Sequence, residues 1–186
     1  MAEITEDVEV RVAAESDYYR SLKSQNTDVF QAAQNFVESY YSALTKPGAR
    51  EHLTNFYLTP SQSQKVDINM NGTLIPSPSA LQEIFTKQVN KCHYDVQSYD
   101  CQVTNKDYAI GRPENLGNTH EKGGRRMSIL VTVSGTVKFW GEDGAPGEVR
   151  GFSDVVFLVP NWNTFGGKAI KARRWLIQSQ TFRLVV

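Results

Sequence analysis

A period-two alternation from Met127 to Trp140 constrains the fold of this chain more than any other feature. Ile129, Val131 and Val133 recur at every second position, and mostly hydroxyl-bearing or charged residues stand between them. This period is typical of a β-strand with one buried face. The same pattern recurs elsewhere in the second half of the chain. We therefore predict four long strands, at residues 94–103, 127–140, 152–159 and 174–185.

Helical patterns dominate the first half. Residues 28–46 place apolar side chains at helical spacing and end at Pro47-Gly48, a second short helix is expected at residues 49–58, and a third begins at Ser77-Pro78. Between them, Asn71-Gly72 predicts a hairpin turn joining residues 66–70 to 73–75. This order predicts an α+β domain over residues 27–186, with three helices on one face of a curved antiparallel sheet. Residues 1–26 are expected to form an N-terminal extension that is helical or frayed.

The face of the predicted sheet that points away from the helices carries fewer charges than a face exposed to water normally does. It mixes small hydroxyl side chains with large apolar ones, a composition typical of an interface core. We expect a second sheet to pack on it, the alternative being a crossing loop of this same chain. A β-bulge in any strand would exchange its two faces. The predicted interface residues are Leu130, Thr132, Ser134, Thr136, Lys138, Val155, Phe157, Trp175, Ile177, Ser179, Thr181 and Arg183.

Arg183 is the unusual member of this set, because it stands between Phe182 and Leu184 in the last predicted strand. The guanidinium of an arginine between two sheets loses its hydration. A carboxylate that accepts two hydrogen bonds from it compensates for that loss. A homodimer would bring two Arg183 side chains close together across its axis, so a different partner chain is favoured. The alternative is an exposed arginine near a fraying chain end.

Two long loops combine basic and aromatic residues. Residues 104–126 are polar and glycine-rich, and residues 160–174 contain Trp162 and Phe165 but no acid. Cations beside aromatic rings suit single-stranded RNA, through phosphate attraction and base stacking. The alternative for both loops is a solvated hairpin whose aromatic side chains dock on the domain. The candidate RNA contacts are Lys168, Lys171, Arg173, Arg174, Arg125 and Arg126.

The composition excludes several classes of protein. Twenty basic residues balance 20 acidic ones, which argues against a protein that coats nucleic acid. No run of about 18 apolar residues predicts a membrane span. Cys92 and Cys101 have no metal-ligand spacing with histidines, and no glycine-rich phosphate loop appears, so neither a metal nor a cofactor is expected. The two cysteines are interpreted as reduced thiols of an intracellular protein.

Asp154 is the one candidate for catalysis, because the alternation points it inward among apolar residues. A buried acid with nearby tyrosines or amides could serve an isomerase or dehydratase. The histidines are poorly placed to assist it, so we interpret Asp154 as a buried, hydrogen-bonded carboxylate. We expect no catalytic residue.

Five segments occur in an order that resembles a known family: "AAQNFVESYYSAL", "YDVQSYDCQV", "VTVSGTVKFWG", "RGFSDVVFLV" and "TFRL". Over residues 28–186 the chain resembles nuclear transport factor 2-like proteins, and within them the small subunits of the mRNA export receptor heterodimer. The resemblance implies a non-catalytic, cone-shaped domain that pairs sheet to sheet with the receptor's large subunit. In that family, the arginine of the terminal "FR" pair, here Arg183, forms a salt bridge with an acid of the large subunit.

The resemblance also implies partners and a location. The heterodimer carries messenger ribonucleoprotein through nuclear pores by contacting phenylalanine-glycine nucleoporins, and it shuttles between nucleus and cytoplasm. Fungal relatives are thought to contact RNA or ribosomal particles through loops such as those described above. A homodimeric carrier of a small GTPase, which is the role of nuclear transport factor 2 itself, is the alternative within the same fold.

Overall fold

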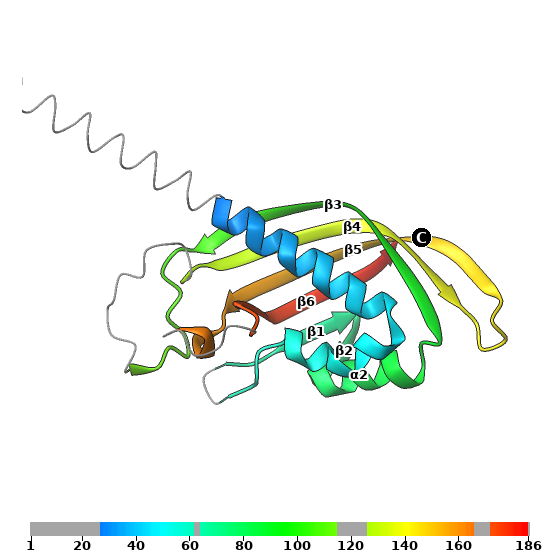
Figure 1. The fold of residues 1–186 in the computed structure, drawn as a ribbon, viewed down its shortest axis with the longest axis horizontal. Coiled ribbons are helices and arrows are strands. Elements are labelled where there is room, and N and C mark those ends of the chain that lie inside the picture. The colour runs from blue at the N-terminus through cyan, green and yellow to red at the C-terminus, as the bar shows by residue number, and fades with distance from the viewer. Residues whose placement is uncertain (1–26, 62–63, 115–125, 166–171, 186) are drawn as a thin grey trace, which may run out of the picture.

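The computed structural model describes residues 27–61, 64–114, 126–165 and 172–185, and its centre is one six-stranded sheet. The strands lie in the order β2-β1-β6-β5-β4-β3 (Figure 1). Four neighbouring pairs are antiparallel, whereas β1 and β6 are parallel. The prediction of an entirely antiparallel sheet is therefore wrong at this pair: the short hairpin joins the far side of the last strand. The strands are β1 Asp67–Met70, β2 Thr73–Ile75, β3 Lys91–Asn105, β4 Ser128–Trp140, β5 Pro146–Pro160 and β6 Trp175–Val185.

The helices form one layer in front of the sheet (Figure 1). A helix that includes residues 27–45 crosses it, followed by the 3₁₀ segment η1 (Pro47–Phe56) and the α-helix α2 (Pro78–Lys87). The predicted cap of α2 is confirmed, since the Ala80 N–H donates to Ser77 Oγ over 3.1 Å. A short 3₁₀ turn, η3 (Trp162–Thr164), follows β5. In the described part of the chain, no helix is long and apolar enough to cross a membrane.

The core lies between the helical layer and the inward face of the sheet. Ile129, Val131 and Val156 are fully buried there, as the alternation predicts, and Tyr40 and Phe36 face them from helix 27–45. The predicted hairpin is also confirmed: Asn71 and Gly72 both adopt positive φ, at 54° and 88°, which matches the type of turn that joins short paired strands.

A β-bulge at Gln178 changes the assignment of faces in β6. Phe157 pairs with Ser179, but the next residue, Leu158, pairs with Ile177, so Gln178 is the extra residue. Upstream of this point the strand alternates in the opposite phase. Ile177 is therefore fully buried in the core and Trp175 packs against it. Our prediction that these two side chains point away from the helices is wrong for this reason.

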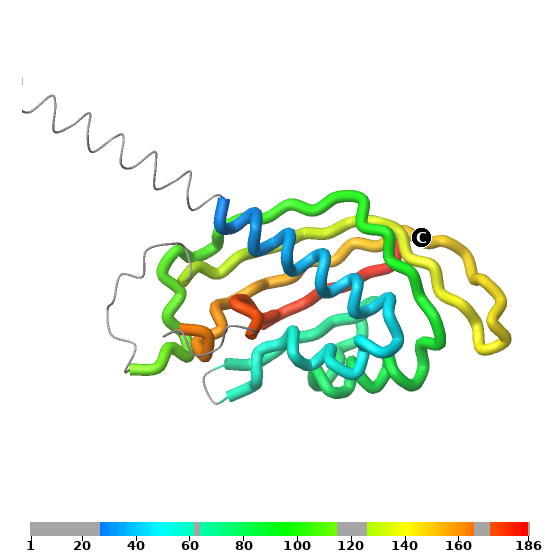
Figure 2. Tube along the Cα trace, viewed as in Figure 1, coloured from blue at the N-terminus to red at the C-terminus, as the bar shows by residue number. Residues whose placement is uncertain are grey.

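The β4–β5 hairpin extends past the helices at one end of the molecule, as the Cα trace in Figure 2 shows. Its tip is held by a backbone hydrogen bond of 3.0 Å from the Gly141 N–H to the Ala145 carbonyl oxygen. Asn90, just before β3, donates its side-chain amide to the Gly141 carbonyl oxygen over 3.1 Å. The second bond connects the hairpin to the start of β3.

Arg50 lies buried at the junction of the helices, with only 2% of its surface exposed. Its guanidinium donates to the Leu44 carbonyl oxygen over 2.8 Å and to the Phe85 carbonyl oxygen over 3.1 Å. A further contact of 3.1 Å joins it to Cys92 Sγ. Backbone carbonyls near the ends of helix 27–45 and α2 thus receive donors from one side chain.

Candidate functional site

The face of the sheet opposite the helices, which we call the uncovered face, is the candidate site. The strand register shows which residues lie side by side on this face. Thr132 on β4 pairs with Val155 on β5, which pairs with Thr181 on β6, and Thr181 pairs with Asn69 on β1. No described helix lies on this side (Figure 1).

Most predicted interface residues lie on the uncovered face. Phe157 and Leu130 are half-buried, and Val155 is 37% exposed, although all three are apolar. Only Trp175 and Ile177 are on the other face, because of the bulge at Gln178. The predicted residues that share the uncovered face are Leu130, Thr132, Ser134, Thr136, Lys138, Val155, Phe157, Ser179, Thr181 and Arg183.

The structure adds Leu74, which the sequence analysis did not assign to this face. Leu74 on β2 pairs with Asn69 and is 68% exposed, the largest exposure among the exposed large hydrophobic side chains described. Ser153 stands between Ser134 and Arg183 in the register. Alternation alone could have indicated Leu74, since Ile75 beside it is buried. Its place on this face depends on the parallel pairing of β1 with β6, which has no local signal in the sequence.

Arg183 is exposed and points toward the β1–β2 turn. A Cβ added at Gly72 would lie 4.0 Å from Arg183 Nη1. The adjacent backbone is fixed, because the Leu184 N–H donates to Asn71 Oδ1 over 2.7 Å. Within the described residues, no acidic side chain forms an ion pair with this guanidinium. The strand therefore presents a positioned but unneutralised cation. The acids that the register places on the same face, Asp67, Asp95 and Asp100, form no ion pair with it.

This chain covers one end of the face itself, as the alternative interpretation expected. Val159 is fully buried in a small cluster with Leu58, Tyr108 and Trp162. The Trp162 indole N–H donates to the Ile110 carbonyl oxygen over 3.0 Å, and Tyr108 Oη donates to Gln178 Oε1 over 3.0 Å. The extra residue of the bulge thus anchors this loop, whereas Thr132, Val155 and Thr181 farther along the face are exposed.

A groove of about 720 Å³ runs between helix 27–45 and β3, which is an edge strand. Its lining is mainly apolar and aromatic, with Val37 and Tyr41 from the helix and Val96 from β3. At one end Phe30, which is 54% exposed, stacks on Tyr99 with ring centroids 5.9 Å apart. Edge strands with apolar surroundings are common sites of peptide addition.

Asp154 is completely buried and belongs to a hydrogen-bonded network. Tyr41 Oη and Gln180 Nε2 both donate to its Oδ2, over 2.9 and 2.6 Å. Gln180 Oε1 in turn accepts from Tyr40 and Tyr57. Burial raises the pKa of Asp154 to about 6, against the opposing effect of its hydrogen bonds. The inward orientation of Asp154 and its contacts with a tyrosine and an amide agree with the sequence analysis.

Three of the six candidate RNA contacts lie in the described part. Arg174 is exposed. Arg173 is half-buried, with its guanidinium carbon 3.4 Å from the Phe56 ring centroid and a 3.0 Å hydrogen bond to Ser39 Oγ. Arg126 is half-buried just before β4. Lys168, Lys171, Arg125 and the predicted extension at residues 1–26 lie outside the described residues.

Comparison with known proteins points to one family. Residues 32–184 match the family model described as the Nuclear transport factor 2 (NTF2) domain. A comparison with curated protein sequences gave no match.

Solved structures agree with this match. A chain in the complex of the Chaetomium thermophilum Mex67 NTF2-like domain with Mtr2 is 29% identical, with a TM-score of 0.70, over 85% of this chain and 99% of that one. The structure of Mtr2 is 27% identical, with a TM-score of 0.69 and the same coverage. A dehydratase-like protein of Streptomyces avermitilis is 13% identical, with a TM-score of 0.55 over 88% of this chain and 99% of that chain, which shows the fold alone.

Proposed function

The chain belongs to the nuclear transport factor 2 domain family, and from this premise we propose that it is the non-catalytic small subunit of a heterodimeric mRNA nuclear export receptor. In this proposal it stabilises the large subunit by packing sheet against sheet. The similarity to Mtr2, and to a chain in the complex of Mtr2 with the Mex67 NTF2-like domain, supports this role. The proposed partner is accordingly an NTF2-like domain of the Mex67 type.

The observation that carries the proposal is the combination of an uncovered face, apolar at its centre on β4 and β5, with the unneutralised Arg183. Val155, Phe157 and Leu130 form an apolar strip on that face, and covering such a strip favours association. A carboxylate on the partner would neutralise Arg183 and fix the orientation of the two sheets. Such a pair contributes more to specificity than to affinity, because desolvation offsets much of the attraction.

A homodimeric carrier of a small GTPase is the competing proposal within the family. A twofold axis through the uncovered face would place two copies of Arg183 in one interface. The acids on the described part of this face, Asp67, Asp95 and Asp100, lie on β1 and β3 and not on β5 beside Arg183. The repulsion favours a different partner chain. Light scattering of the isolated chain distinguishes the two: a stable homodimer supports the carrier.

An enzyme of the isomerase or dehydratase type is the second alternative, with Asp154 as its acid or base. Asp154 has no exposed surface, and aromatic rings close around it. The Tyr41 and Phe152 centroids are 5.5 Å apart, as are those of Tyr94 and Phe152. A substrate would have to displace this packing, so we assign Asp154 a structural role.

We extend the proposal to passage through nuclear pores. The groove beside β3 offers Tyr41, Val37 and Val96 as an apolar lining, which suits the phenylalanine side chains of phenylalanine-glycine nucleoporins. This partner also implies a protein that shuttles between the nucleus, the nuclear pore and the cytoplasm. Titration of a phenylalanine-glycine peptide against the wild type and Val96→Asp tests the groove, and equal affinities would contradict it.

RNA contact by the basic loops is a secondary part of the proposal. Arg174 is exposed and available, whereas Arg173 already stacks on Phe56. The test therefore replaces Lys168, Lys171 and Arg174 by alanine and keeps Arg173. RNA is then titrated at two salt concentrations. If the salt dependence of RNA affinity is the same in the variant and the wild type, RNA contact by these residues is contradicted.

The main proposal is tested by co-expressing the chain with a Mex67-type NTF2-like domain. Size-exclusion chromatography with light scattering should show a one-to-one complex. Separate elution of the two chains, with a homodimer or monomer of this one, would contradict the proposal.

A further inference from the structure

A cluster of cations surrounds one tryptophan where the uncovered face continues onto the β4–β5 hairpin. Lys91 Nζ lies 4.4 Å from the centroid of the Trp140 ring, and Lys138 Nζ lies 5.3 Å from it. The register places Lys91 opposite Trp140 and His93 opposite Lys138. Because Cys92 is buried on the other side of β3, these four residues share the uncovered face. We call them the cationic end.

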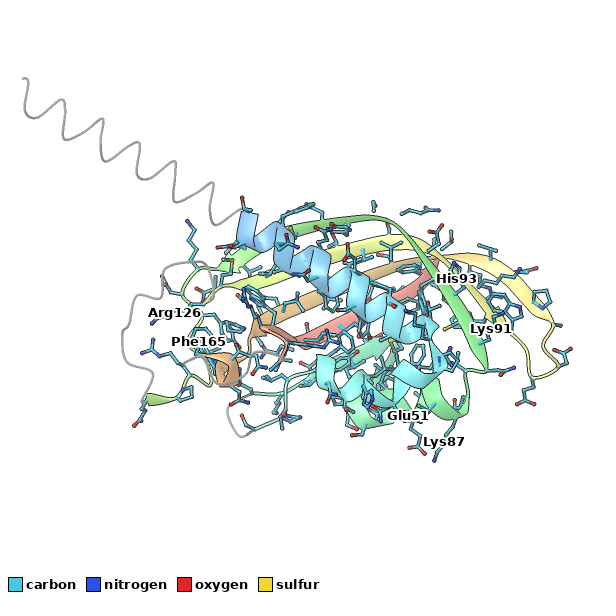
Figure 3. The ribbon with its side chains drawn as sticks, viewed as in Figure 1. Glu51, Lys87, Lys91, His93, Arg126 and Phe165 are labelled. Carbon is cyan, nitrogen blue, oxygen red and sulfur yellow. The ribbon has the colours of Figure 1, made fainter. Side chains whose placement is uncertain are left out.

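Figure 3 shows Lys91 and His93 where β3 adjoins the hairpin strands, and Arg126 and Phe165 at the opposite end of the molecule. The cationic end is therefore separate from the loops considered above for RNA contact. It is also separate from the covered end of the face, where Trp162 docks.

The cationic end offers hydrogen-bond donors without acceptors of its own chain. In the described part of the protein, neither ammonium group forms an ion pair with an acidic side chain, and the Trp140 indole N–H has no hydrogen-bond partner. Lys91 is exposed, and Lys138 and Trp140 are half-buried. The indole ring attracts both ammonium groups, which holds them beside it.

The backbone under the cluster is held in place. Asn90, next to Lys91, is hydrogen-bonded to Gly141, next to Trp140. The Ala145 N–H donates to Asp143 Oδ1 over 2.9 Å, which closes the turn. A preorganised surface of this kind loses little conformational entropy when a partner binds.

The surroundings favour a protein over a nucleic acid. Glu142, Asp143 and Glu148 are exposed near the tip of the hairpin, and they would repel a run of phosphates. Val149, which pairs with Lys138, is 61% exposed and adds an apolar side chain to the uncovered face at this point. A carboxylate on an otherwise apolar protein surface matches both features.

We propose that the cationic end is a second anchoring point of the heterodimer interface, and that it receives a carboxylate group of the partner subunit. This inference rests on the proposed function. In the complex, the carboxylate accepts hydrogen bonds from the two lysines and the indole N–H. Together with Arg183, it fixes the two sheets at two separate points, which sets their relative rotation.

The test compares the affinity of a Mex67-type NTF2-like domain for wild type, Lys91→Glu/Lys138→Glu and Trp140→Phe at low and moderate salt. We expect the double variant to bind at least about tenfold more weakly at low salt and to lose much of the salt dependence. Trp140→Phe, which removes the N–H donor but keeps an aromatic ring, should weaken binding several-fold. Lys65→Glu/Lys87→Glu is the matched control, with the same change of net charge at two exposed positions outside the cluster.

Each outcome decides between the inference and the proposed function. If the double variant binds like the control while Arg183→Ala binds weakly, the inference is overturned and the proposed function stands. If the wild type does not bind the domain, both the inference and the proposed function are overturned. If the double variant keeps its protein affinity but loses affinity for a single-stranded RNA oligonucleotide, the cationic end is an RNA site and the inference is overturned. Thermal unfolding of each variant establishes that it is folded.

Discussion

Arg183 on β6 lies directly opposite Ser153 on β5, on the face of the sheet that no described helix covers. The small, uncharged serine leaves the guanidinium without a counter-charge on the neighbouring strand. Because the sheet is continuous here, the arginine is presented by a rigid surface and not by a loop. This pair of residues is the local reason for assigning the face to a partner that carries an acid.

Arg183→Ala should weaken the heterodimer much more than it destabilises the domain. We expect at least about a tenfold loss of affinity, because an acid on the partner is left unpaired in the interface. The free energy of unfolding should change by less than about 0.5 kcal/mol, since the side chain is exposed. Calorimetric titration and urea unfolding measure the two effects, with Arg150→Ala as an exposed arginine control. Equal losses in both would show that the face is wrongly assigned.

Ile177→Ala and Val155→Ala should behave in opposite ways, because the bulge at Gln178 separates their faces. Ile177 is fully buried, so its truncation should cost about 2–5 kcal/mol of unfolding free energy. Val155 is 37% exposed, and its truncation should mainly reduce affinity for the partner. Urea unfolding of both variants beside the binding titration checks this. A stable Ile177→Ala variant with weak binding would instead show that β6 alternates without a bulge and that Ile177 lies on the uncovered face.

Asp154 should make the protein more stable in mild acid than at neutral pH. Its folded-state pKa is raised from 3.8 to about 6, so the folded state holds the proton more tightly than the unfolded state. The corresponding stabilisation is fully present below about pH 4 and is lost as the pH rises to about 6, by about 3 kcal/mol in total.

Asp154→Asn tests this dependence, because the amide oxygen can still accept from Tyr41 and Gln180. Urea unfolding of both proteins between pH 4 and 8 should show a difference in unfolding free energy that shifts in favour of the variant as the pH rises. Two parallel curves would show that Asp154 does not titrate in this range.

Arg50→Met should destabilise the domain by about 3 kcal/mol or more, because buried carbonyl oxygens of Leu44 and Phe85 lose their donor. Methionine fills a similar length without donating. Arg50→Lys should be intermediate, since one ammonium group cannot reach every acceptor. Chemical unfolding measures both variants, and wild-type stability in Arg50→Met would contradict the role given to this side chain.

Local patterns in the sequence predicted much of this architecture. Alternation placed Ile129 and Val131 in the core correctly, and Ser77 and Asn71-Gly72 marked a helix start and a turn. The two errors, at Ile177 and in the all-antiparallel sheet, concern pairing between distant segments. A bulge at Gln178 and a parallel contact between β1 and β6 depend on packing across the whole domain, which no local period records.

The candidate site divides in the same way. Arg183 and Val155 could be assigned to one face from alternation, since each strand is regular around them. Leu74 and Lys91 could not be joined to that face, because their positions depend on the strand order and register. The network around Asp154 likewise depends on how helix 27–45 packs on the sheet, which brings Tyr41 to the carboxylate.

The most direct test of the central claim is the rate of thiol labelling at Thr181→Cys, in the middle of the uncovered face. The measurement is made in a Cys101→Ser background, because Cys101 is the more accessible of the two native thiols, and compares the free protein with its complex with a Mex67-type NTF2-like domain. Thr86→Cys, exposed on α2, is the control. The account predicts strong protection at position 181 in the complex and unchanged labelling at position 86. Equal labelling of position 181 in both states would contradict it.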